Sequence, residues 1–171
     1  MNTDLPYHTI PAVPPESNAQ NTIARMVDGL AFRYRWATEG LAQENLNFRP
    51  SPNSMDLNEL MHHVYDLAFR SDKRFGGIKS HDISLKSLDN LRTLTLTHFN
   101  NLSIRLKAMD DKAFNDFVQE DVSKYSFWYC LNGPIADALT HVGQIISWRR
   151  ILGNPQPEGV NVFLGKPPED R

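Results

Sequence analysis

Four segments of the chain carry apolar residues at intervals of three and four positions, and this spacing is the strongest constraint on its fold. The first segment begins near Ser17 and ends before residues 45–53. Its apolar residues are Ile23, Met26, Val27, Leu30, Ala31, Tyr34, Ala37 and Leu41. Such a period places them on one face of an α-helix, whereas a strand needs sustained alternation of apolar and polar residues, which the chain lacks.

Three further segments have the same period. The second begins after Asp56, whose spacing to Glu59 is typical of a capping box, and extends to about Ser71. The third covers residues 87–109, and the fourth begins at residues 132–134, "NGP". We therefore expect four long amphipathic helices.

The ends of the fourth segment carry signals for helix boundaries. Asn132 is a typical N-cap residue. Pro134 would then lie in the first turn, where its missing N–H is not needed, and Gly153 stands just past the end. The less regular stretch before it, residues 110–131, predicts only a short helix over residues 113–117.

These helices predict a single all-α domain over residues 1–171, a four-helix bundle with a long crossover. Four apolar faces are buried most simply against one another in a chain of 171 residues. The second helix is roughly 24 Å long, whereas the linker of residues 72–86 can extend to roughly 50 Å. The linker can thus return across the domain, which makes the second and third helices parallel neighbours. Residues 1–16 predict a Pro-rich N-terminal arm, and residues 154–171 predict a Pro-rich tail along the bundle.

The composition argues against several functional classes. The formal net charge is −2 and the basic residues are scattered, so nothing favours nucleic-acid binding. No segment has the 18 or so consecutive apolar residues of a membrane span, and no signal peptide is recognisable at the start. Cys130 is the single cysteine, which excludes an internal disulfide and a cysteine-rich zinc site. We expect a cytoplasmic protein.

A candidate metal site emerges from the spacing of polar residues on two helices. Asp137 and His141 stand at i and i+4, so their side chains meet on successive turns of the fourth helix. Gln144 and Trp148 continue the same column and are candidates for the mouth of a pocket. On the second helix, the helical period places His63 beside the apolar face.

The same period makes the other candidates weaker. It directs His62 toward solvent. Glu59 and Asp66, at i−4 and i+3 from the metal-ligand candidate on this helix, could accept a hydrogen bond from its second ring nitrogen. His98 lies within the apolar stripe of the third helix, so we predict a buried histidine with its own partner. Spacing alone leaves open that Asp137 and its i+4 neighbour form only a surface ion pair.

Two stretches resemble the signature helices of the DinB superfamily, also called DinB/YfiT-like metalloenzymes. They are residues 57–67, "LNELMHHVYDL", and residues 127–155, "FWYCLNGPIADALTHVGQIISWRRILGNP". The resemblance extends over nearly the whole chain, and "HVGQI" followed by "RR" and "GNP" is its most specific part. It implies a four-helix bundle of up-down-down-up order that forms homodimers.

The resemblance also implies a metal triad of three histidines. Carried over to this sequence, the ligands fall on His63 and His141, while Asp137 stands where the family has its third histidine. Two histidines and one carboxylate are an established open arrangement for zinc or iron. We expect a divalent metal, with zinc or nickel ahead of iron and manganese.

Two functions of different class are compatible with these residues. The first is a metal-dependent enzyme that transfers or isomerises a small molecule with a low-molecular-weight thiol, or hydrolyses one, as the resemblance implies. The second is a non-catalytic, stress-associated homodimeric bundle whose metal site is structural or degenerate. An open coordination position favours the enzyme.

Two further residues have structural roles in this interpretation. Arg149 lies in the apolar stripe near the end of the fourth helix. It would pair with an acid and with terminal carbonyl groups, although an anionic substrate group is an alternative partner. Cys130 is expected to be a packed, inert thiol.

Overall fold

The computed structural model describes residues 5–77, 87–120 and 125–169, and these are helical apart from loops and the two terminal segments. The elements are α1 (Ala19–Ala37), the 3₁₀ helix η1 (Gln43–Asn47), α2 (Leu57–Arg74), α3 (Leu88–Ala108), α4 (Asp111–Glu120), α5 (Phe127–Cys130), the π-helical segment η2 (Leu131–Ile135) and α6 (Ala136–Ile151). Within the described ranges, the only β pairing is an isolated bridge between Asn161 and Lys166. The predicted all-α class is therefore confirmed for this part of the chain. None of its helices is both long and apolar enough to cross a membrane.

The starts of the long helices follow from side-chain caps that the sequence supplies. The Asn18 side chain accepts a hydrogen bond from the backbone N–H of Asn21 at the start of α1. At the start of α2, Asp56 accepts from the N–H of Glu59, whose carboxylate accepts from the N–H of Asp56. This reciprocal pair is the predicted capping box, and it satisfies two amides that the helix itself leaves unpaired.

The last helical region begins earlier than predicted. Ser126 caps α5, and the helical backbone continues from Phe127 through η2 into α6. Asn132 is exposed within η2, so its predicted role as the N-cap was wrong. The physical reason is Pro134, which has no N–H to donate; the chain passes it in a wider π-type turn instead of starting a new helix there.

Two other boundaries differ from the predictions. α1 ends at Ala37, so Leu41 lies beyond it in the connection to η1. The short helix expected over residues 113–117 is longer, because α4 covers Asp111–Glu120. The predicted linker of residues 72–86 is partly replaced by the end of α2, and its residues 78–86 lie outside the described residues.

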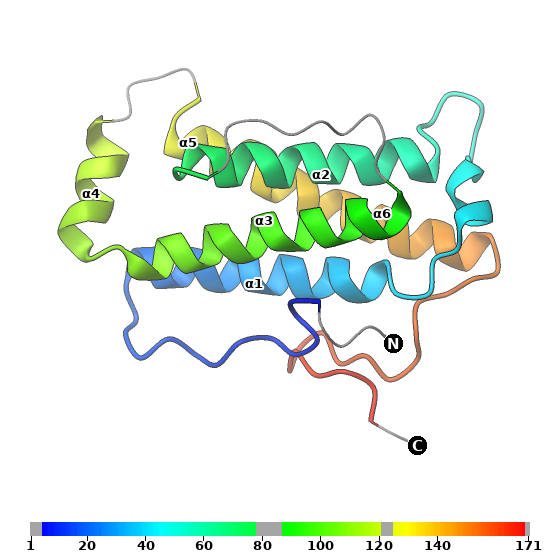
Figure 1. Cartoon of the computed structure of the whole chain (residues 1–171), viewed down its shortest axis with the longest axis horizontal. Coiled ribbons are helices and arrows are strands. Elements are labelled where there is room, and N and C mark those ends of the chain that lie inside the picture. Colours follow the sequence, from blue (N-terminus) through cyan, green and yellow to red (C-terminus); the bar gives the residue numbers. More distant parts are fainter. Residues whose placement is uncertain (1–4, 78–86, 121–124, 170–171) are drawn as a thin grey trace.

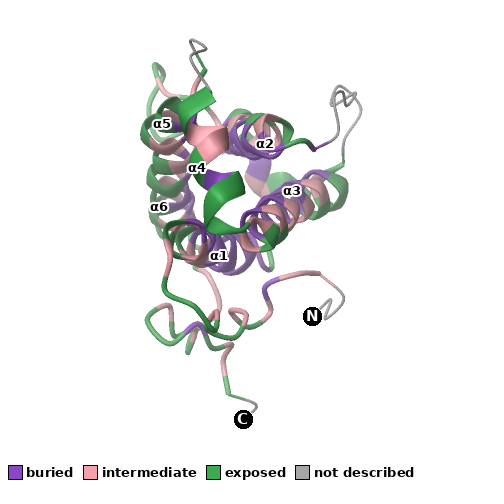
Figure 2. Cartoon of the chain, turned by 90° about the vertical axis from the view of Figure 1, so that its left-hand side faces the viewer, coloured by how far each residue is buried: buried purple, intermediate pink, exposed green. Residues whose placement is uncertain are grey.

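The four long helices enclose the core. α1 and α2 each pack against both α3 and α6, and α4 contacts α1 (Figure 1). Figure 2, which views the bundle along its long axis, shows the buried residues on the helix faces that point inward. Core residues include Val27, Leu30, Leu60, Val64, Leu96, Phe99, Ala138, Val142 and Ile145. The seam between α2 and α6 is one of the four contacts, and it carries the candidate site.

The two terminal segments lie together below α1 in Figure 1. The buried Tyr7 hydroxyl donates to Oδ1 of Asp28 on α1 at 3.0 Å, and Nε1 of Trp36 donates to the carbonyl of His8 at 3.2 Å. The N–H of Ile10 donates to the carbonyl of Gly165 at 2.9 Å. The N-terminal arm therefore packs on α1, and the C-terminal tail packs on the arm.

Candidate metal centre

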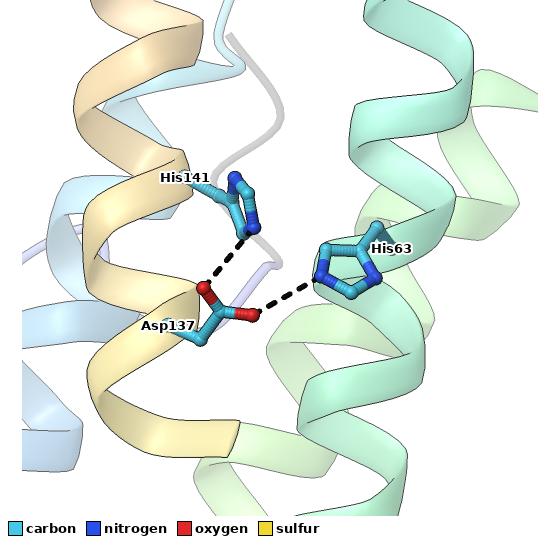
Figure 3. A group of neighbouring side chains, drawn as sticks. All are labelled: His63, Asp137 and His141. Carbon is cyan, nitrogen blue, oxygen red and sulfur yellow. Dashed lines mark hydrogen bonds and ion pairs between the residues drawn. The ribbon is translucent and has the colours of Figure 1, made fainter. Parts of the chain in front are cut away.

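His63, Asp137 and His141 converge on one point beside the core (Figure 3). Nε2 of His63 lies 3.2 Å from Oδ2 of Asp137, and Nε2 of His141 lies 3.3 Å from Oδ1 of the same carboxylate. The two imidazole rings are 4.7 Å apart between centroids and nearly perpendicular, at 82°. Each oxygen of the carboxylate thus faces a different histidine.

Helix packing places these side chains. Asp137 and His141 lie on successive turns of α6, as the i, i+4 spacing predicted. His63 comes from α2, which packs directly against α6. Val64 and Val142, the neighbours of the two histidines in the sequence, are buried in the core. The apolar faces of the two helices therefore fix the backbone positions from which the three polar side chains project.

Gln144 holds the ring of His141 in place. Nδ1 of His141 lies 2.7 Å from Oε1 of Gln144, one turn further along α6. The amide oxygen accepts a hydrogen bond from the ring when Nδ1 carries the proton. The lone pair of the neutral imidazole is then on Nε2, which faces Asp137. Metal-ligating histidines typically have such a partner on the other nitrogen.

The donor set and its geometry fit a divalent cation. One ligand atom from each of the three residues lies within 4.8 Å of the others. Bonds of about 2.0–2.2 Å in a tetrahedral site separate neighbouring ligand atoms by about 3.3–3.6 Å. The contacts of 3.2 Å from His63 to Oδ2 and of 3.3 Å from His141 to Oδ1 are each close to this separation, although they use different oxygens of the carboxylate.

The site is open to solvent on one side. The side chain of Asp137 is 44% exposed and that of His63 is 36% exposed, whereas that of His141 is 12% exposed. Three protein ligands with an accessible face leave room for a further ligand, which distinguishes catalytic metal sites from closed structural ones.

The remaining candidates from the sequence have other partners or positions. Glu59 belongs to the capping box and pairs with Arg49 at 2.9 Å. Asp66 accepts from Nε of Arg70 at 2.6 Å. Trp148 lies seven residues beyond His141, about 10 Å along the helix, and packs partly buried against the core.

The histidines that we set aside lie outside the cluster. His62 is partly exposed and is not a member of it. His98 is buried on α3, with Nδ1 2.7 Å from Oδ2 of the buried Asp72. The prediction of a buried histidine with its own partner on α3 is confirmed.

Arg149 is buried at the far end of the bundle and is not available to a ligand. Its guanidinium donates to the carbonyl of Ala37, the last residue of α1, at 2.8 Å and to the carbonyl of Glu39, just past α1, at 2.7 Å. It also donates to Asn154 and to the carbonyl of Pro155. Burial, with the nearby charge of Arg92, lowers the pKa of Arg149 to about 10. Arg149 does contact carbonyl groups at a helix end, as predicted, but these carbonyls belong to the end of α1 and to the C-terminal tail.

A cavity of about 430 Å³ lies between the end of α2 and the α5–η2 region. Its lining residues are Arg70, Lys73, Arg74, Tyr125, Tyr129, Cys130 and Pro134. Sequence reasoning missed the three basic residues. The sequence does contain a signal for one of them, because Arg70 stands seven residues after His63 and therefore lies on the same face of α2 as the metal-ligand candidate. Cys130 is buried, as expected of a packed thiol.

Comparisons of the chain with models of known protein families, with curated proteins and with solved structures produced no match. The geometry of the site and the resemblance in the two stretches are therefore the observations that bear on function.

Proposed function

We propose that this chain is a divalent-metal-dependent enzyme of the DinB superfamily, with His63, Asp137 and His141 as the metal ligands. The observation that carries the proposal is the convergence of the three donor groups on an accessible point between α2 and α6. The reaction we propose is thiol-dependent transfer or isomerisation of a small molecule, or hydrolysis of one.

The course of the helices supports the family part of the proposal. In Figure 1, α1 and α6 run from left to right, whereas α2 and α3 run from right to left. This agrees with the up-down-down-up order that the resemblance implies. A homodimeric state and a cytoplasmic location belong to the same proposal.

The residues of the site have distinct roles in this function. His63, Asp137 and His141 would hold a divalent ion, which would supply Lewis acidity and lower the pKa of a bound water or thiol toward neutrality. Asp137 lowers the net charge of the site by one unit relative to three imidazoles and favours harder ions. Gln144 lies beside Nδ1 of His141 and favours the tautomer that directs the Nε2 lone pair at the ligand position. The exposed face between His63 and Asp137 admits the substrate.

Metal content, measured by elemental analysis of protein made without a histidine tag, tests the ligand set. His63→Ala and His141→Ala should each remove the bound metal and leave the helical content unchanged. His62→Ala is the matched control, since it changes the adjacent residue and should keep the metal. Undiminished metal in both ligand variants would contradict the triad and would leave two ion pairs between the histidines and Asp137.

Consumption of low-molecular-weight thiols by the metal-loaded protein tests the reaction class. A panel of electrophilic and ester substrates should show metal-dependent turnover that His141→Ala abolishes. The opposing hypothesis is a non-catalytic homodimeric bundle with a structural or degenerate site. It predicts metal-dependent stability without turnover of any thiol or ester.

A further inference from the structure

The cavity beside α5 has a positively charged lining, although the net charge of the chain is −2. Arg70, Lys73 and Arg74 of α2 form one wall. No carboxylate belongs to the lining among the described residues. At about 430 Å³ the cavity is within the range of small-molecule sites.

The opposite wall is aromatic and apolar. The rings of Tyr125 and Tyr129 pack edge to face with centroids 5.1 Å apart, and both residues are partly exposed, at 53% and 41%. Pro134 of η2 completes this wall. A cavity with cations on one side and rings on the other suits a molecule that has an anionic group and an apolar body.

The basic residues differ in how they are held. Nε of Arg74 donates to the carbonyl of Tyr125 at 2.9 Å, which joins α2 to the segment before α5. Nε of Arg70 donates to Asp66, which orients the guanidinium on a side chain that is 60% exposed. Lys73 is exposed next to it, with its ammonium 5.8 Å from the Phe69 ring. Arg70 and Lys73 are therefore the cations best placed to meet a ligand.

The cavity and the metal centre share one seam of the bundle. Arg70 lies seven residues after His63 on α2, and Pro134 lies seven residues before His141 across η2 and α6. On α2, seven residues make nearly two helical turns, so His63 and Arg70 share a helix face and are about 10 Å apart along the axis, whereas Pro134 lies in the wider turn of η2 just before α6 begins. Asp66 lies between His63 and Arg70 on that face.

From this arrangement we infer that the cavity is the anion subsite of the proposed enzyme. It takes an elongated small molecule whose carboxylate or phosphate group lies between Arg70 and Lys73. The body of that molecule lies against Tyr129 and Pro134, and its reacting end, about 10 Å away, lies at the triad. The inference rests on the proposed function for the identity of the reacting end, but binding of the anion does not require the metal.

An NMR titration of chelator-treated protein with inorganic phosphate, and separately with acetate, tests the subsite at low ionic strength. Saturable shifts are expected for backbone amides of residues 70–74 and 129–133. Stronger binding of phosphate would indicate a phosphate-bearing substrate, and stronger binding of acetate would indicate a carboxylate. Shifts that do not saturate for either anion would overturn the inference.

Variants assign the binding to the two cations. Arg70→Gln combined with Lys73→Gln should weaken binding by about tenfold or more, because charge-assisted hydrogen bonds are lost. Lys112→Gln combined with Arg150→Gln removes the same charge from exposed positions on α4 and α6 and should leave binding unchanged. Equal weakening in both double variants would overturn the inference in favour of non-specific attraction. Arg70→Lys combined with Lys73→Arg retains the charge and should retain most of the binding, which separates loss of the cations from loss of the fold.

Asp137→Asn separates the subsite from the metal centre. This variant should lose metal and still bind the anion with the affinity of the unchanged protein. If the unchanged protein binds metal but no anion, the subsite is overturned and the proposed function stands. Anion binding by a protein that never retains metal would overturn the proposed function and leave the subsite standing.

Discussion

Nε2 of His63 lies 3.2 Å from Oδ2 of Asp137, although the two residues are 74 positions apart in the chain. Their contact depends on the packing of α2 against α6, which buries Val64 and Val142 beside them. The apolar contact should form without the polar one, since burial of large aliphatic side chains supplies the main driving force for helix packing. Changes to the triad should therefore alter metal binding far more than stability.

Replacing Asp137 by His should retain or tighten the binding of zinc. The variant restores the three imidazoles that the resemblance implies, and imidazole is a stronger zinc ligand than a single carboxylate oxygen. Competition with a chromophoric chelator measures the affinity, and Asp137→Ala provides the comparison without any ligand. A lower zinc affinity in Asp137→His than in the unchanged protein would count against Asp137 as a ligand.

Replacing Gln144 by Leu should weaken metal binding by roughly 10–100-fold, because His141 loses the acceptor that fixes its ring. Gln144→Glu keeps an acceptor at the same position and should retain the affinity. Ser147→Ala, one turn further along α6 and exposed, is the control for a change on the same helix. Equal affinity of Gln144→Leu and the unchanged protein would show that His141 needs no partner.

The helical class and the candidates on each helix were predictable because both follow from periodicity within single helices, whereas the meeting of His63 with Asp137 and His141 was implied only by the resemblance. The period of α2 selected His63 over His62, and the i, i+4 spacing paired Asp137 with His141 before any contact between helices was known. Asn132 was misleading because its local signal for an N-cap is genuine, and only the cap at Ser126 and the wider turn of η2 override it.

Contacts between distant segments could not be predicted in the same way. Arg149 donates to the carbonyl of Ala37 across 112 positions of sequence, a partner that no local pattern specifies. The cavity likewise requires α5 to lie beside the end of α2, and the position of α5 depends on the late start of the last helical region.

Glu39 should make stability fall in acid. Burial alone would raise the pKa of its carboxyl, but the charges and hydrogen bonds of Arg92 and Arg35 lower it below the ordinary value of 4.5. The unfolded chain then binds the proton more readily, so the contribution of Glu39 is complete above about pH 4.5 and is lost as the pH falls through the folded-state pKa.

Urea unfolding of the unchanged protein and of Glu39→Gln at several pH values checks this dependence. Near neutral pH the variant should be less stable by about 3 kcal/mol, since two buried guanidinium groups lose their counter-charge. The difference should shrink in acid. Glu44→Gln, at an exposed position of η1, should follow the unchanged protein throughout. A difference between Glu39→Gln and the unchanged protein that does not vary with pH would contradict the assigned role.

Two glycine replacements should change stability in opposite directions. Gly165 has φ +64°, and a Cβ atom there would overlap the side chain of Ile10, which joins the tail to the arm. Gly165→Ala should therefore destabilise the docked arm and tail by roughly 1–3 kcal/mol. Gly143, between His141 and Gln144, lies on the exposed face of α6, and a Cβ atom added there would meet no other atom within 4 Å. Gly143→Ala should raise stability by about 0.5–1 kcal/mol, because alanine loses less backbone entropy in a helix.

Urea unfolding gives the stability of both glycine variants, and limited proteolysis within residues 5–18 reports on the arm. Faster cleavage there is expected for Gly165→Ala alone. Metal affinity should be unchanged in Gly143→Ala, since the added methyl group points away from the ligands. Weaker metal binding or lower stability in Gly143→Ala would mean that the outer face of α6 is covered in solution, as it would be by a second copy of the chain.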